Sequence, residues 1–312
     1  MRIGLDVMGG DHYPHAPLAG AVAYSRRTDS DAVLVLIGDA EIIHTELVRM
    51  DASPSDFVIV SAPEIISMDE HPSKAVVSKP HSSISVGIRM LREKQIDAFV
   101  SAGNTGAMMA GSVLMLGCIG SVQRPTVGTI IPIGDKTSFL CDVGANTDCK
   151  PDHLVQFAQL GSMFMREVMQ VSNPRVALLN IGEEKKKGSN LVQQAYELLE
   201  KQPGINFIGN AQGWDLLRHS ADVYVVDGFA GNLLLKFSES LYDFLKPMLP
   251  DEPEIEKFNF ETIGGLPFLG VSGNVVIGHG ISGPTAFDNM IHRAVDLCRS
   301  RLLDTFARAF SA

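Results

Sequence analysis

The sequence is poor in cysteine, tryptophan and cationic residues. Its 312 residues include four cysteines and one tryptophan, and 26 lysines and arginines stand against 36 aspartates and glutamates. The cysteines, at positions 118, 141, 149 and 298, have no disulfide or metal-site spacing, which favours a reducing compartment. A formal net charge of −10 disfavours nucleic acid as a partner, because nucleic-acid binding normally requires a basic face. No apolar run approaches the roughly 20 residues that a membrane-spanning helix needs.

Motifs of nucleotide-binding, metal-dependent and secreted proteins are also missing. The glycine-rich segment 99–111 has no G-x-G-x-x-G, and its G-x-x-x-x-G is followed by Ser112-Val113 where a Walker loop needs Lys-Ser/Thr. The histidines show no H-E-x-x-H or comparable spacing, so we expect neither a metal nor another cofactor. The N-terminus enters the strand-like run 2–8 without a signal-peptide pattern, which predicts a cytoplasmic protein.

What the sequence does contain is an alternation of short β-branched runs with longer helical patterns. The β-branched runs are residues 3–7, 32–37, 57–60, 98–101, 128–133, 139–142, 175–180, 206–208, 223–226 and 274–277. A helical period recurs over residues 82–93, 153–170, 190–200 and 284–303. This alternation predicts the α/β class, with a doubly wound, mostly parallel sheet flanked by helices, in a single domain over residues 1–312. The proline-bearing, acidic segment 247–267 is predicted to be an irregular excursion.

Small and polar residues follow six of the predicted strands. These strand ends are Asp6-Val-Met-Gly-Gly-Asp11, Ser101-Ala-Gly-Asn-Thr-Gly106, Asp142-Val-Gly-Ala-Asn-Thr-Asp148, Asn180-Ile-Gly-Glu-Glu184, Gly209-Asn210 and Asp227-Gly-Phe-Ala-Gly-Asn232. In an open parallel sheet the carboxyl ends of the strands line one crevice, and ligands bind there. Glycine permits close backbone approach, and Asn, Ser and Thr donate hydrogen bonds without adding charge. The pattern predicts a shared polar site, although any one of these loops can be an ordinary turn.

Charged residues near these strand ends indicate an anionic ligand. Lys187 closes a lysine run that follows the strand ending at Asn180, which makes it a candidate anion ligand, although such runs are usually solvated faces. Asp227 follows an apolar run and can orient a lysine, accept a proton or cap the next turn. Cys149 is a weaker candidate for a nucleophile. His279 is either a site residue or a buried structural histidine.

Together these motifs resemble those of the bacterial phosphate acyltransferases, the acyl-ACP:phosphate transacylases of phospholipid synthesis. Segments 6–11, 101–107, 142–151, 180–188 and 227–232 carry the resemblance, which runs from residue 1 to the C-terminal helix. The resemblance implies reversible transfer of a fatty acyl group from acyl carrier protein to inorganic phosphate. The acyl phosphate would then serve a membrane glycerol-3-phosphate acyltransferase in phosphatidic acid synthesis. It also implies a homodimer, and an αβα fold like that of isocitrate and isopropylmalate dehydrogenases.

The resemblance also assigns roles to residues at the strand ends. Lys187 is expected to contact phosphate or the developing oxyanion, and Asp227 to orient Lys187 or handle a proton. The residues expected to bind phosphate and acyl phosphate are Asp6, Gly9, Gly10, Asp11, Ser101, Gly103, Asn104, Thr105, Gly106, Asn146, Asp148, Lys150, Asn180, Asn232 and His279. Because inorganic phosphate is already an anionic nucleophile at neutral pH, the enzyme's task is to position the reactants and stabilise the oxyanion.

The partners follow from the same resemblance. Many family members carry a longer, basic, amphipathic hairpin where this chain has the short acidic segment 246–267, which lacks the pattern of an interfacial helix. Any membrane association is therefore expected to be peripheral and through a partner. An acidic carrier protein needs a local basic patch, for which two groups are candidates: Arg89, Arg92 and Lys94, or Arg293, Arg299 and Arg301. The alternative functions are a nicotinamide-dependent dehydrogenase on the related fold and a non-catalytic carrier-binding protein.

Overall fold

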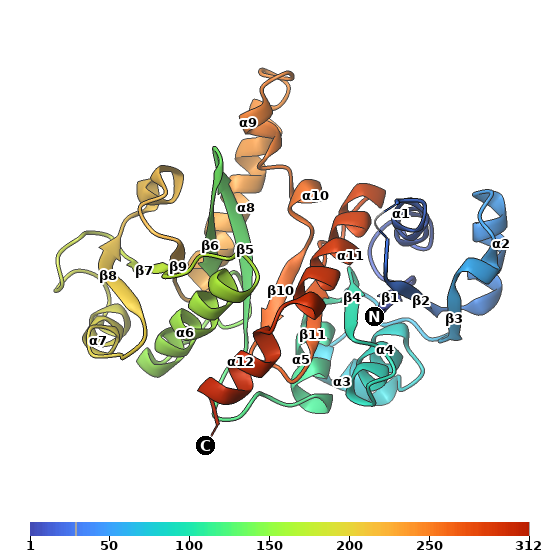
Figure 1. Ribbon diagram of the computed structural model, residues 1–312, viewed down its shortest axis with the longest axis horizontal. Coiled ribbons are helices and arrows are strands. Elements are labelled where there is room, and N and C mark those ends of the chain that lie inside the picture. The colour runs from blue at the N-terminus through green and yellow to red at the C-terminus, as the bar shows by residue number, and fades with distance from the viewer. Residues whose placement is uncertain (29, 312) are drawn as a thin grey trace. The chain divides into compact units, whose positions relative to one another are not determined.

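The computed structural model describes residues 1–28 and 30–311, and it separates into two compact units. Unit 1 comprises Met1–Gly117 and Phe260–Leu303, and unit 2 comprises Cys118–Asn259 and Asp304–Ala312 (Figure 1). Each unit has its own strands and helices, so each is described by itself. That residues 1–312 act as one domain stays a prediction.

Unit 1 is built on a mostly parallel sheet. Its strand order is β3-β2-β1-β4-β11-β10, in which only β10 runs antiparallel to its neighbour β11. The strands are β1 (Arg2–Asp6), β2 (Val33–Gly38), β3 (Val58–Ser61), β4 (Ala98–Ser101), β10 (Leu266–Leu269) and β11 (Asn274–Ile277). Strands β4 and β11 are buried along their whole length, as expected for parallel strands that helices cover on both faces.

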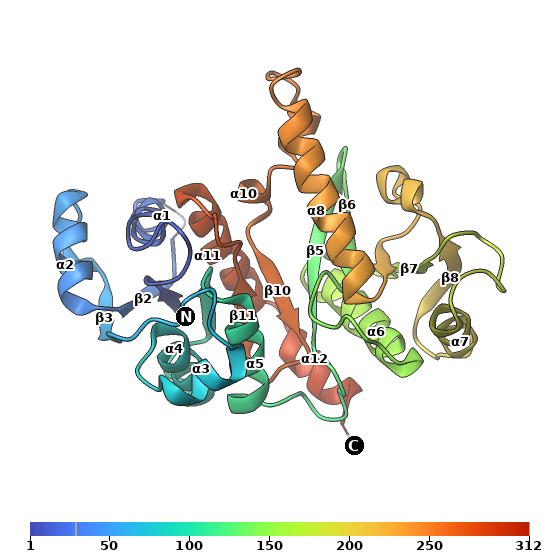
Figure 2. The same ribbon diagram turned by 180° about the vertical axis from the view of Figure 1, so that it is seen from behind.

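The helices of unit 1 lie on the two faces of this sheet. They are α1 (His15–Ser25), α2 (Ala40–Arg49), η1 (Pro54–Asp56), α3 (Pro72–Ser78), α4 (Ser83–Arg92), α5 (Thr105–Met115), α10 (Phe260–Ile263) and α11 (Pro284–Arg299). Helices α1 and α11 pack together on one face, and α3, α4 and α5 pack together on the other (Figure 2). Gly20 of α1 allows this close packing, because a Cβ there would lie 2.5 Å from the Cβ of Phe287 in α11.

Unit 2 repeats the layered arrangement around strands in the order β5-β6-β9-β7-β8. The strands are β5 (Thr126–Ile133), β6 (Lys136–Cys141), β7 (Arg175–Leu179), β8 (Asn206–Ala211) and β9 (Val223–Val225). Strands β5 and β6 form an antiparallel hairpin, whereas β6, β9, β7 and β8 are parallel. The helices are α6 (Pro151–Glu167), α7 (Asn190–Leu199), η2 (Gly213–Arg218), α8 (Gly228–Leu245) and α9 (Pro253–Glu256). Most of α12 (Leu302–Ala309) also belongs to this unit.

The α/β class and the mostly parallel sheet with flanking helices are confirmed. The ten predicted strands all recur, with ends shifted by a few residues. The prediction missed β10, because its first residues fall in the segment that was expected to be irregular; α9 and α10 lie there as well. The predicted helix 284–303 was too long, since α11 ends at Arg299 and Ser300 takes an extended conformation. Within the described residues, no helix combines the length and apolar character needed to cross a membrane.

Candidate functional site

In unit 1, the loops that follow β1 and β4 are joined through a buried carboxylate. Asp6, the last residue of β1, accepts hydrogen bonds from the Met8 nitrogen at 2.9 Å and from the Ser101 hydroxyl at 2.6 Å. The Ser101 oxygen in turn accepts the Gly103 N–H at 3.0 Å. Both side chains are fully buried, and burial raises the pKa of Asp6 against the opposing effect of these hydrogen bonds. Asp6 and Ser101 thus hold the loops together from inside the protein.

The glycines of these loops allow three strand ends to meet. A Cβ on Gly9 would lie 2.6 Å from the Gly103 nitrogen, so the β1 and β4 loops touch through their backbones. Gly10 has a φ of +95°, a conformation that favours glycine. The backbone N–H of the next residue, Asp11, donates to the Gly280 carbonyl oxygen at 2.7 Å. The β11 loop also carries His279, whose ring centroid lies 5.5 Å from that of Phe260. The structure therefore brings the predicted unit 1 residues together.

Asn104 has a structural role that the sequence did not reveal. Its side-chain oxygen accepts the Ala107 N–H at 2.9 Å and so caps helix α5. Its amide nitrogen donates to the Ser67 carbonyl at 2.9 Å and to the Met68 carbonyl at 3.2 Å, and so fixes the loop before α3. The neighbouring Thr105 is exposed. The first N–H groups of α5 have no partner within the helix, so this helix start remains suited to an anion.

In unit 2, a second buried aspartate has the corresponding position at the end of β6. Asp142 accepts the Gly144 N–H at 2.9 Å, the Ala145 N–H at 2.8 Å and the Asn146 side-chain N–H at 2.7 Å. Burial raises its pKa to about 6, although these hydrogen bonds act in the opposite direction. The Asn146 amide also donates to the Pro125 carbonyl at 2.8 Å, so both of its N–H bonds are used within the protein.

Cys149 lies in the same loop, but its surroundings disfavour a nucleophile. Its sulfur lies 3.3 Å from the Asn146 carbonyl oxygen. Burial, followed by the negative charges of Asp142 and Asp227, raises the pKa of the thiol to about 12. A thiol must lose its proton to act as a nucleophile, so the reactive thiolate is scarce at neutral pH.

Asp227 begins helix α8 beside this loop. One oxygen of its carboxylate accepts the Phe229 and Ala230 N–H groups, both at 3.0 Å, which is the capping role among the three considered from the sequence. The Gly228 nitrogen donates to the Asn146 carbonyl at 2.7 Å. Asn232, one turn further along the helix, is exposed and lies next to Gly144.

The loop after β7 presents Lys187 to solvent. Asn180 fixes this loop, because its amide nitrogen donates to the Lys187 carbonyl at 3.1 Å, and Asn210 adds a bond to the Glu184 carbonyl at 3.1 Å. The Lys187 side chain is 52% exposed, and its amine lies 4.0 Å from a carboxylate oxygen of Glu184. Gly209 and Asn210 are themselves inside β8 and not beyond its end, as the sequence had suggested.

The remaining predicted residues of unit 2 are more peripheral. Asp148 and Lys150 are both exposed, and Lys150 contributes a backbone N–H that donates to the His153 ring at 3.1 Å. The predicted site residues thus form one group in each unit. That the two groups face a common crevice stays a prediction. Asp142 opens one of the strand-end motifs but was not among the residues expected to bind phosphate, although a carboxylate directly after a buried strand is a signal for a functional group.

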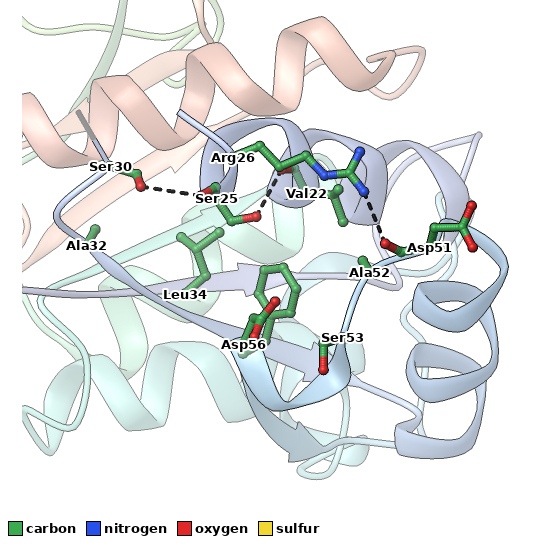
Figure 3. Close-up of a pocket in the computed structure, with 11 residues that line it drawn as sticks. Val22, Ser25, Arg26, Ser30, Ala32, Leu34, Asp51, Ala52, Ser53 and Asp56 are labelled. Atoms are coloured by element: carbon green, nitrogen blue, oxygen red, sulfur yellow. Dashed lines mark hydrogen bonds between the residues drawn. The ribbon is translucent and has the colours of Figure 1, made fainter. Parts of the chain in front are cut away.

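A pocket of about 300 Å³ in unit 1 is lined by residues before β2 and β3, among them Ala32 and Phe57 (Figure 3). Figure 3 shows Arg26 bonded to the Asp51 carbonyl, at 3.2 Å, on one side of this pocket. These segments precede the strands, whereas the predicted site residues follow them.

The chain matches known proteins over nearly its whole length. A family model described as "Fatty acid synthesis protein" matches residues 1–304. A phosphate acyltransferase of Salinibacter ruber is 41% identical, in an alignment that covers 100% of this chain and 98% of the relative. A phosphate acyltransferase of Dictyoglomus turgidum is 42% identical, with 93% and 92% covered. The chain belongs to the phosphate acyltransferase family.

The members of this family are named as acyltransferases, and their fold extends to a wider group. A phosphotransacetylase structure from Streptococcus pyogenes matches with a TM-score of 0.68 at 13% identity, and the match covers 96% of this chain and 94% of that one. This likeness shows a shared α/β fold. The family membership supports acyl transfer to phosphate, and it leaves the acyl donor to be argued from the site.

Proposed function

We propose that the protein transfers a fatty acyl group reversibly from the thioester of acyl carrier protein to inorganic phosphate. A phosphate oxygen attacks the thioester carbonyl, a C–O bond forms, the C–S bond breaks, and the carrier thiol leaves with a proton. The products are acyl phosphate and free carrier. The acyl phosphate would then supply a membrane glycerol-3-phosphate acyltransferase in phosphatidic acid synthesis.

The observation that carries the proposal is the placement of Lys187 and Asp227 after neighbouring parallel strands of unit 2. Strands β7 and β9 are paired, so the loops that bear the two residues leave the same edge of the sheet. Lys187 is exposed on a loop that Asn180 and Asn210 hold in shape. A fixed loop with an extended cation can neutralise phosphate or the developing oxyanion, for which one well-placed donor contributes about 3 kcal/mol.

The chemistry requires no covalent enzyme intermediate. Phosphate is an anionic nucleophile, so holding it in line with the thioester carbonyl supplies much of the rate enhancement. In unit 1, the helix start at Thr105 and Gly106 offers N–H groups to an anion, and the loops around Gly9 and Gly103 allow close approach. These features support a phosphate subsite without any recognition of a base or ribose.

An acidic carrier protein would dock on a basic surface. Arg92 and Lys94, at the end of α4, are exposed, and Arg89 is half-buried. In the other candidate group, Arg299 already pairs with Asp31 at 2.7 Å and Arg293 is largely enclosed, which lowers the pKa of its guanidinium. The end of α4 is therefore the better candidate for the carrier.

Helix α8 supports the proposal of a homodimer. It presents exposed apolar side chains at helical spacing, Phe229, Leu233, Phe237, Leu241 and Phe244, and Met248 is exposed just beyond the end of the helix. The segment that follows is acidic, with Asp251, Glu252 and Glu254, which disfavours both an anionic membrane and an acidic carrier as the partner. A second copy of the chain suits such a surface. Phe237→Ser should then shift the molecular mass in solution towards that of a monomer, whereas the exposed Val77→Ser should not.

The decisive experiment incubates the protein with acyl-ACP and phosphate and traps acyl phosphate as its hydroxamate. Lys187→Ala and Asp227→Ala should each reduce product formation by about 100-fold. Lys186→Ala, which removes a neighbouring exposed lysine, should have little effect. Absence of any phosphate-dependent product from the wild type would leave a carrier-binding protein. Reduction of a nicotinamide cofactor in a parallel assay would favour a dehydrogenase.

A further inference from the structure

The starting observation is a short chain of contacts beneath Asp227. The Asp142 carboxylate accepts the Asn146 side-chain N–H at 2.7 Å, and the Asn146 carbonyl accepts the Gly228 N–H at 2.7 Å. Gly228 is the first residue of α8, directly after its capping residue Asp227. Two hydrogen bonds thus connect a buried carboxylate to the helix start that Asp227 caps.

The backbone packing is tight along this path. A Cβ on Gly228 would lie 2.8 Å from both the nitrogen and the oxygen of Asn146. Gly231, one turn into α8, lies directly against the carbonyl oxygen of Asp142. The start of α8 therefore has little freedom to shift while the β6 loop keeps its shape, and that shape depends on the three hydrogen bonds that Asp142 accepts.

We propose that Asp142 is a positioning residue for acyl transfer, which holds Asn146 and through it the start of α8, so that Asp227 stays aligned. This inference rests on the proposed function. Asp142 is fully buried, so it acts through the groups that it holds in place, of which Asn146 leads to the start of α8. The ionised carboxylate accepts hydrogen bonds on both oxygens. In the protonated carboxyl group, one oxygen carries a hydrogen of its own, which interferes with the three bonds that Asp142 accepts.

Within the cluster around Asp142, the Asp142 carboxyl is the group that changes its charge near pH 6. Burial raises the pKa of the Cys141 thiol and brings that of Cys149 to about 12, so both stay neutral near pH 6. Asp227 of α8 and Asp148 of the same loop contribute negative charge near Cys149. On α6, burial and the nearby Arg124 and Lys150 lower the pKa of His153. The pKa of Asp142 itself is about 6.

The test compares Asp142→Asn with the wild type in acyl phosphate formation from pH 5 to pH 8. The asparagine keeps one oxygen for the Gly144 and Ala145 N–H groups but turns an N–H towards Asn146. We expect kcat to fall about tenfold at pH 8, because one hydrogen bond to a charged group is lost. The ratio of wild-type to variant activity should approach 1 at pH 5, where the wild-type carboxyl is itself protonated. Ionisation of phosphate affects both proteins equally and cancels in this ratio.

Two further variants keep the test decisive. Asp39→Asn is the matched control, because Asp39 also accepts two backbone N–H groups but caps α2 in unit 1, whereas Asp142 lies in unit 2. Its activity ratio should stay near 1 at every pH. If Asp142→Asn does not fold, Asn146→Ala breaks the same link between Asp142 and Asn146. The ratio of wild-type activity to that of Asn146→Ala should likewise be largest at pH 8 and shrink towards pH 5. If the double variant with Asp142→Asn and Asn146→Ala folds, its kcat should be no lower than that of the less active single variant.

The outcomes separate this inference from the proposed function. A wild-type protein that forms no acyl phosphate would refute the proposed function itself. A wild type that is active, with a ratio for Asp142→Asn that does not change between pH 5 and pH 8, would refute the positioning role, since a purely structural defect has no reason to follow the ionisation of Asp142.

Discussion

The Gly228 nitrogen donates a 2.7 Å hydrogen bond to the carbonyl oxygen of Asn146, and this bond joins the start of α8 to the loop after β6. Residues far apart in the sequence thereby form one polar cluster in unit 2. The loops after β1 and β4 are joined in unit 1 by the corresponding bond between Ser101 and Asp6. Each unit thus places a buried aspartate beneath its candidate site residues.

Gly231→Ala should destabilise the protein. The added methyl group would meet the Asp142 carbonyl oxygen, which is backbone and cannot move aside, so we expect a loss of about 3 kcal/mol in the free energy of unfolding. Chemical denaturation measures this change. Gly213→Ala is the control, because a Cβ at that position meets no atom within 4 Å, and it should change stability by less than about 0.5 kcal/mol. Equal effects of the two substitutions would contradict the packing described for Gly231.

Ser101→Ala should cost about 1–3 kcal/mol of folding free energy, because the buried Asp6 loses the hydrogen bond from the Ser101 hydroxyl. The pKa of Asp6 should rise further, since the Ser101 bond lowers it. Ser112→Ala is the matched control: within the described residues, the Ser112 hydroxyl is buried without a hydrogen-bond partner. Its removal should be neutral or stabilising. Thermal and chemical unfolding at pH 7 compare the two variants.

The stability of the wild type should depend on Asp142 between pH 4 and pH 6. Its pKa is raised from 3.8 to about 6 on folding, so the folded state binds the proton more tightly than the unfolded state does. Protonation of Asp142 contributes its full stabilisation below about pH 4, and this contribution is lost as the pH rises through 6. The free energy of unfolding changes by about 3 kcal/mol as a result. Unfolding free energies of wild type and Asp142→Asn, measured from pH 4 to pH 8, isolate this term. The wild type should lose stability relative to the variant as the pH rises, and a constant difference would contradict the raised pKa.

Asn104→Asp and Asn104→Ala should separate the two roles of this side chain. Aspartate keeps an oxygen to cap α5 but loses the N–H groups that hold the Ser67 and Met68 carbonyls. Alanine loses both roles, and the cap alone contributes about 1 kcal/mol. Hydrogen exchange should increase around residues 67–70 in both variants, and at the first turn of α5 only in the alanine variant. Increased exchange at α5 in the aspartate variant would argue against the capping role.

Much of the fold could be predicted from local patterns. The β-branched run of β4 and the spacing of apolar residues in α6 reflect backbone geometry and burial, which act over a few residues at a time. Strand β10 was missed because Leu266–Leu269 follows a proline-bearing, glycine-containing stretch and pairs antiparallel with β11, a partner that no local pattern reveals. No local pattern indicates the two compact units either, because unit 1 combines the first and last parts of the chain.

The sequence by itself determined which residue types gather at the strand ends, and through them the family. Only the tertiary structure decided what those residues do within the protein. Asn104 and Asn146, expected to face a ligand, donate their amide N–H groups to backbone carbonyls and, for Asn146, to Asp142. The Lys187 side chain stays exposed on a fixed loop, with its amine 4.0 Å from a Glu184 carboxylate oxygen. The physical reason is that a polar group's partners are set by distances across the fold, and the linear order of the chain does not contain them.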